Sequence, residues 1–157
     1  MDYVASTDLL FFSQLIIAML LGIILGAERS FAGKTAGMRT YALVSLGSCL
    51  LVIISKSVTS RYIAPNEADS LLRVLAGIIT GIGFVGAGII FSHESHVSGL
   101  TTAAGLWIAA GIGIAVGFDL YLLATFGTFL TLFTFTALWY VEKAVRRISS
   151  KTKGDVE

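Results

Sequence analysis

The stretch that decides the fold is VLAGIITGIGFVGAGIIF, residues 74–91. It is apolar throughout and close to the ~20 residues that an α-helix needs to cross a bilayer. Gly77, Gly81 and Gly88 recur at spacings that place them on one helix face. Because small residues let helix backbones approach closely in lipid, we expect this helix to be the centre of a bundle, with neighbours on more than one side.

Four further apolar runs flank this stretch, at about residues 9–27, 40–55, 100–118 and 120–141. Hydrophobic residues make up 55% of the 157-residue chain and charged residues only 13%, whereas soluble domains carry about 25% charged residues. This composition excludes an ordinary soluble globule and a disordered chain. Residues 1–141 are therefore predicted to form an all-α, polytopic membrane helix bundle of about five transmembrane helices.

The basic residues predict the orientation of the bundle. With the N-terminus outside, eight Lys and Arg residues face the cytoplasm and three face outside. The positive-inside rule therefore predicts an outside N-terminus and an inside C-terminus, with residues 142–157 as a basic cytoplasmic tail. The start, Met1-Asp2-Tyr3, has no basic n-region, so we expect no cleavable signal peptide.

Small residues also occur at helical spacing in two other spans, namely Gly22 and Gly26 in the first and Ala109, Gly113 and Gly117 in the fourth. They predict packing seams of the same kind. The fifth span has one glycine and is rich in Leu, Phe and Thr. We expect it to be peripheral, or reserved for a contact between copies of the chain.

Two motifs suggest chemistry that their context does not support. Residues 81–86 match the dinucleotide-binding pattern G-x-G-x-x-G, but they lie inside an apolar span, and no acidic residue follows about 20 positions later. His93, Glu94 and His96 lack the spacing of a zinc-protease helix. A solvated loop is the simpler interpretation, and a weak or regulatory metal site or a pH sensor is the alternative. We expect no cofactor, and the net charge of +1 gives no reason to expect nucleic-acid binding.

Charged residues sit at the span ends, where Glu28 and Arg29 follow the first span, Arg39 precedes the second and Arg73 opens the third. A charge deep in a bilayer costs at least ~2.5–3.5 kcal/mol, so these groups should lie near an interface or pair with one another. A Glu28–Arg39 pair across the first loop is plausible. The span centres carry no Asp, Glu, Lys, Arg or His, which disfavours a proton-coupled transporter. No nucleophile with a base is evident, so we expect no enzyme.

Four motifs in order resemble the MgtC/SapB family of bacterial inner-membrane proteins. They are GAER at residues 26–29, AGMRTYALV at 36–44, GIGFVGAGII at 81–90 and VSGLTTAAGLW at 97–107. The resemblance implies four or five spans, an outside N-terminus and, for virulence-associated members, growth in low magnesium and survival in macrophages. Those members usually carry a soluble regulatory domain after the spans. This chain resembles a short form, and we expect no ligand control through such a domain.

The resemblance also implies which residues matter. The motif positions are Glu28, Arg29, Gly37, Arg39, Thr40, Arg73, Gly81, Gly83, Gly86, Gly88, Gly99, Thr101 and Thr102. We expect the glycines to form a close-packed core and Glu28, Arg29 and Arg39 to form a polar docking site at the inner face. A hydroxyl of Thr101 or Thr102 is expected to cap the fourth span, because it can accept from free amides there.

Two functions are consistent with these features. The first is a non-enzymatic regulator of another inner-membrane complex, such as ATP synthase or a magnesium pump. A structural role as an assembly or stability factor for a magnesium pump is a variant that differs from it mainly in the partner. The alternative is a small oligomeric channel or transporter for a cation such as magnesium, with a pore lined by backbone carbonyls and hydroxyls such as Thr80. In both cases the partners are the lipid bilayer and, because the chain is small, a second copy in a homodimer.

Overall fold

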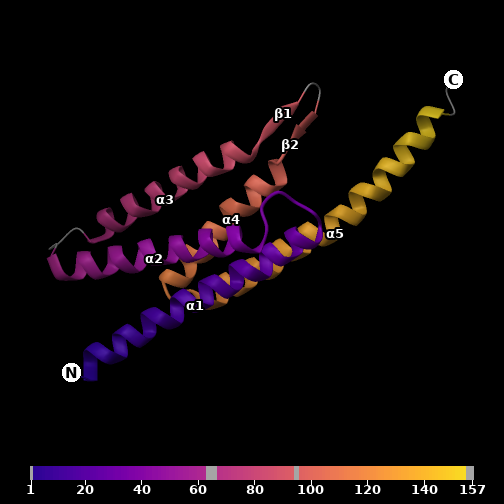
Figure 1. The fold of residues 1–157 in the computed structure, drawn as a ribbon. Coiled ribbons are helices and arrows are strands. Elements are labelled where there is room, and N and C mark those ends of the chain that lie inside the picture. Colours follow the sequence, from indigo (N-terminus) through magenta and orange to yellow (C-terminus); the bar gives the residue numbers. More distant parts are fainter. Residues whose placement is uncertain (1, 63–66, 94–95, 155–157) are drawn as a thin grey trace.

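The computed structural model describes residues 2–62, 67–93 and 96–154. The described residues form five helices, which alternate in direction through one bundle (Figure 1). They are α1 (Asp2–Phe31), α2 (Met38–Tyr62), α3 (Glu67–Ile89), α4 (Leu100–Gly117) and α5 (Tyr121–Gly154). A short antiparallel hairpin of β1 (Phe91–His93) and β2 (His96–Ser98) joins α3 to α4. The predicted all-α helix bundle is confirmed.

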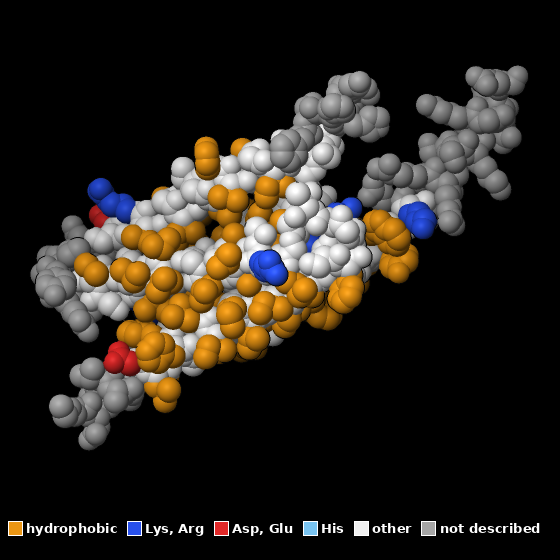
Figure 2. Space-filling model, viewed as in Figure 1, with side chains coloured by type: hydrophobic (Ala, Val, Ile, Leu, Met, Phe, Trp, Pro, Cys, Tyr) orange, Lys and Arg blue, Asp and Glu red, His pale blue; other side chains and the backbone are white. Residues whose placement is uncertain are grey.

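Each helix contains a segment that is long and apolar enough to cross a membrane. These segments are Asp8–Phe31, Met38–Thr59, Asp69–Ile89, Leu100–Gly117 and Tyr121–Val141. Hydrophobic side chains cover much of the visible flank of the bundle (Figure 2), as lipid contact requires. The α1–α2 loop and the hairpin lie at one end, called here the first-loop end, and the N-terminus lies toward the other (Figure 1). Which end faces the cytoplasm stays a prediction.

The central helix of the bundle is α4, and the prediction that residues 74–91 form the centre is wrong. α4 packs against α1, α2, α3 and α5, and half of its residues are buried. In the apolar segment of α3 only 17% of residues are buried. α3 places Ile78, Ile82 and Gly86 against its neighbours, so its other face is left open.

The predicted seams on the first and fourth spans are confirmed, because backbone meets backbone at both. A Cβ added at Gly22 would lie 2.6 Å from the carbonyl oxygen of Tyr41. A Cβ added at Gly113 would lie 2.8 Å from the carbonyl carbon of Ser45. α1 and α4 therefore each contact the backbone of α2 directly at these glycines, as small residues allow.

The α3 glycines do not form a core. A Cβ built at Gly77, Gly81, Gly83 or Gly88 would meet no other residue within 4 Å. Only at Gly86, among the motif glycines of α3, would it reach a neighbouring helix, at Ala103 of α4. α5 is peripheral, as predicted, with 17% of its apolar segment buried.

The expected hydroxyl cap of α4 is also wrong. The N-cap is Gly99, which has φ +88° and makes no side-chain cap hydrogen bond. A Cβ at Gly99 would collide with the carbonyl of Ile89, so only glycine fits this turn between the hairpin and the helix. Thr101 and Thr102 lie inside the first turn instead, and among the described side chains none caps the first amides of α4.

Candidate functional site

The first-loop end holds a buried ion pair in the last turn of α1. Arg29 is only 3% exposed, and its Nε donates to the carboxylate of Glu28. The guanidinium carbon lies 3.6 Å from the ring centroid of Phe135 in α5. A desolvated cation over an aromatic face is worth up to about 2 kcal/mol. Arg29 therefore ties the end of α1 to α5.

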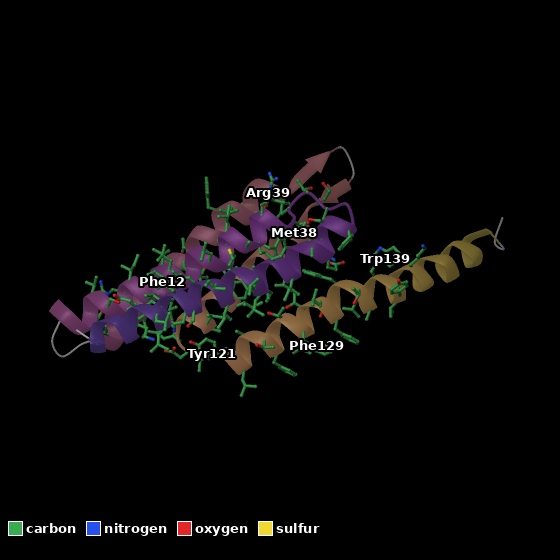
Figure 3. The ribbon with its side chains drawn as sticks, turned by 60° about the horizontal axis from the view of Figure 1, so that its bottom comes forward. Phe12, Met38, Arg39, Tyr121, Phe129 and Trp139 are labelled. Carbon is green, nitrogen blue, oxygen red and sulfur yellow. The ribbon has the colours of Figure 1, made fainter. Side chains whose placement is uncertain are left out.

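The predicted Glu28–Arg39 pair is not formed. Glu28 pairs with its neighbour Arg29. Arg39 is exposed, and its side chain points away from the bundle at the start of α2 (Figure 3). The reason is helical geometry: Arg39 lies on the outer face of α2, while Arg29 lies on the inner face of α1.

A cavity of about 820 Å³ opens beside this ion pair. It lies where the membrane segments of α1 and α5 end and where α4 begins. Its lining residues are Ala27, Glu28, Arg29, Phe31, Ala32, Lys34, Thr101, Thr134, Phe135, Thr136, Leu138, Trp139 and Tyr140. The cavity therefore combines buried charge, hydroxyls and large apolar side chains.

Tyr41 joins three helices under this cavity. It is fully buried, and its hydroxyl donates to the carbonyl of Thr102 at 3.4 Å. A Cβ on Gly105 would lie 2.7 Å from Phe135 and 3.1 Å from Tyr41. Gly105 therefore lets α2, α4 and α5 converge. Sequence reasoning missed this role, although Gly105 lies within the fourth family motif.

The opposite end of the bundle carries a second polar cluster, which the sequence did not predict. Asp119, in the α4–α5 loop at φ +63°, accepts hydrogen bonds from Lys56 at 2.8 Å and Gln14 at 2.6 Å. The hydroxyl of Tyr121 donates to the same carboxylate at 3.2 Å. Lys56 also donates to the carbonyl of Gly117 at 3.1 Å. This cluster therefore fastens α1 and α2 to the α4–α5 loop.

Stability should depend on pH through Asp119. Burial alone raises the pKa of its carboxyl, but the hydrogen bond and charge of Lys56, with the donors Tyr121 and Gln14, lower the net pKa below the ordinary value. A depressed pKa in the folded state gives stability that is present above the unfolded value of about 3.9 and lost as pH falls through the folded value. We expect the wild-type melting temperature to fall over this acid range.

Asp119→Asn should remove that pH dependence. Asn tolerates the positive φ at this position, so the loop geometry is kept while the titrating group is removed. The measurement is the melting temperature of the wild type and the variant from pH 6 to pH 3. We expect a small difference in slope, because the Asp119 side chain is exposed to solvent. Equal slopes for the variant and the wild type would contradict the assignment.

The thirteen motif residues do not form one site. Glu28, Arg29, Gly37, Arg39, Thr40, Gly99, Thr101 and Thr102 lie at the first-loop end. Arg73 is exposed near the opposite end of α3, Gly81, Gly83 and Gly88 have open space around them, and Gly86 lies against α4. Glu94 and the side chains of His93 and His96 lie outside the described residues, so the metal alternative is untested.

The chain is similar to known proteins over most of its length. The model of the MgtC family matches residues 15–144. Protein SrpB of Synechococcus elongatus is 40% identical over 146 residues, which cover 87% of this chain and 76% of SrpB. No solved structure matches the chain.

Two further relatives carry names linked to magnesium or to the family. The Escherichia coli K12 protein named "Putative magnesium transporter YhiD" is 37% identical over 123 residues, 78% of this chain and 57% of that protein. Protein MgtC of Salmonella typhimurium is 42% identical over 91 residues, 58% of this chain and 36% of that protein. The chain thus spans about a third to somewhat more than half of the length of these two relatives.

Proposed function

This chain belongs to the MgtC family, and from that premise we propose that it is a non-enzymatic protein of the bacterial inner membrane that regulates another membrane complex during adaptation to low magnesium. ATP synthase and a magnesium pump are the candidate complexes. The family match and the five apolar helices make the chain a multi-pass membrane protein. The link to magnesium rests on the name of the E. coli relative.

The observation that carries this proposal is the contrast between a closed interior and an open α3. The α1–α2 and α2–α4 seams bring backbones together at Gly22 and Gly113, which leaves no room for a hydrated ion between these helices. On α3, Gly77 and Gly81 face away from the rest of the chain with open space around them.

The open face of α3 is suited to a second helix. Ile78 and Ile82 hold the neighbouring face, about 100° around the helix from Gly77 and Gly81, against the bundle, so α3 is fixed in rotation. Thr80 donates its hydroxyl to the carbonyl of Ala76 at 2.8 Å, so that this exposed side chain is satisfied within its own helix. Small residues drive helix association in lipid by close van der Waals contact. A helix of the regulated complex would pack here.

Gly81→Leu is expected to abolish capture of that partner. The test places a photoreactive residue at Phe84, which is 85% exposed on α3, and identifies cross-linked proteins from cells grown in low magnesium. The added isobutyl group would hold the partner backbone away, and we expect cross-linking to fall at least tenfold, equivalent to about 1.4 kcal/mol.

The matched control is Gly111→Leu, because Gly111 is also exposed with open space around it but lies on α4. Cross-linking that persists in Gly81→Leu would contradict the proposal. Cross-links only between copies of this chain would assign the face to a homodimer instead.

The alternative, an oligomeric magnesium channel, is favoured by one observation. Thr80, Gly81 and Gly83 are all exposed on α3, and several copies could arrange them around a pore. The test is magnesium flux into proteoliposomes that hold the purified protein. We expect no flux above that of protein-free liposomes; flux that Gly83→Leu removes would establish the channel and overturn the regulator.

A further inference from the structure

The cavity at the first-loop end contains cationic donors that the protein leaves without acceptors. A guanidinium has five N–H donors, and among the described residues Arg29 uses only Nε, toward Glu28. Its four Nη hydrogens have no protein acceptor there, although the residue is 3% exposed and lines the cavity. In the described part of the chain, the buried side-chain atoms without a partner are on Gln14 and Ser45, not on Arg29. The Nη groups of Arg29 therefore keep some accessible surface, where an acceptor from outside the chain can reach them.

A second feature, independent of Arg29, also favours an anion. Thr101 places the first turn of α4 on the cavity wall, and α4 begins without a side-chain cap. The free amides and the positive end of the helix dipole make such a terminus a binding site for phosphate groups. Among the described residues, the charged ones that line the cavity are Glu28, Arg29 and Lys34, which are one anion and two cations.

The other walls of the cavity are large apolar side chains together with the hydroxyls of Thr134 and Thr136, and they lie where the membrane segments of α1 and α5 end. Phe31 is 91% exposed and ends the membrane segment of α1. Trp139 and Tyr140 lie in the last turn of the membrane segment of α5, and Lys143 places its ammonium 4.9 Å from the ring of Trp139. Aromatic rings beside basic residues are typical of the headgroup level of a bilayer.

We infer that this cavity binds the phosphate group of an anionic phospholipid. The phosphate would accept from the Nη groups of Arg29, from Lys34 and from the first amides of α4, and the acyl chains would lie along Phe31 and Leu138. A phospholipid has a charged phosphate next to hydrocarbon chains, and the cavity has a cationic part next to an apolar part. Free phosphate could bind the cationic part, but it has no hydrocarbon to contact the apolar part.

The test uses the full chain, purified in detergent and depleted of lipid, and measures bound lipid by native mass spectrometry. The probes are phosphatidylglycerol, phosphatidylcholine with the same acyl chains, and inorganic phosphate. We expect one phosphatidylglycerol per chain to be retained in preference to phosphatidylcholine, and inorganic phosphate to bind weakly.

Two variants locate the binding without removing Arg29, whose loss would unsettle the fold. Lys34→Gln removes an exposed cation from the wall and should weaken phosphatidylglycerol binding about fivefold, since one basic residue near an anionic surface is worth ~1 kcal/mol. Thr101→Asp suits the first turn of a helix but puts a carboxylate in the cavity, and it should weaken binding roughly tenfold or more.

The matched control is Arg39→Gln, which removes an exposed cation at the same end of the bundle but outside the cavity. Unchanged affinity in this control, with weaker binding in the two cavity variants, is the expected result. Phosphatidylglycerol binding that is equal in all three variants would overturn the site. Inorganic phosphate binding as tightly as phosphatidylglycerol, with the same response to the variants, would overturn the lipid assignment in favour of a soluble phosphate.

Discussion

Leucine at Gly113 is expected to destabilise the bundle strongly, whereas leucine at Gly111 should be tolerated. Both glycines lie on α4, but they face in opposite directions. At Gly113 a Cβ would lie 3.0 Å from the Cα of Ser45 in α2, and backbone cannot move aside as a side chain can. At Gly111 the same atom meets nothing within 4 Å.

The expected size of the effect follows from overpacking. Extra methylenes in a packed core cost about 1–3 kcal/mol where side chains can adjust. Because the obstacle here is backbone, we expect Gly113→Leu to cost about 3 kcal/mol or more, which corresponds to roughly 6–12 °C in melting temperature. The measurement is thermal unfolding of detergent-purified protein, followed by circular dichroism and by the monodisperse fraction. Equal melting temperatures for Gly113→Leu and Gly111→Leu would refute the α2–α4 seam.

Arg29→Met is expected to be the most damaging change of a charged residue. It leaves the Glu28 carboxylate without its partner and removes the cation from the face of Phe135. Breaking a buried pair from one side costs about 3–5 kcal/mol, and we expect the lower end because Glu28 retains 18% side-chain exposure. Arg39→Met, at an exposed position, should change stability by less than about 0.5 kcal/mol.

A double variant separates the ion pair from the packing of Arg29. Glu28→Gln combined with Arg29→Met removes both charges, so part of the lost stability should return. Arg29→Lys should not restore it fully, because an ammonium lacks the flat guanidinium that stacks on Phe135. If Arg29→Met melts at the wild-type temperature, the ion pair is not a structural element of this bundle.

The sequence predicted the number and kind of helices correctly because hydrophobic length alone determines a membrane span. It misplaced the centre of the bundle because glycines show only that a helix face permits close approach. They do not show which helix, if any, packs against that face. On α4, Gly113 and Gly117 meet α2. On α3, Gly81 and Gly88 meet no other residue, and nothing in the local pattern distinguishes the two cases.

The polar contacts were harder to predict because they join distant parts of the chain. Gln14 and Asp119 are 105 positions apart yet 2.6 Å from each other. A glutamine inside an otherwise apolar span was the available signal for this contact. Glu28 and Arg29 were identified from their motif. Which arginine, Arg29 or Arg39, forms the ion pair with Glu28 depends on the helix faces that the two arginines occupy after packing.

The length of α5 has a mechanical consequence. It is one unbroken helix of 34 residues, about 50 Å long at 1.5 Å per residue, and its membrane segment ends at Val141. The remaining portion extends away from the other helices (Figure 1) as a stiff lever of roughly 20 Å. A 10° change in the tilt of α5 would swing the lever's tip by roughly 3–4 Å. Because Phe135 of α5 lies against Arg29 and beside Gly105, such a swing would be transmitted to the end of α1 and the start of α4.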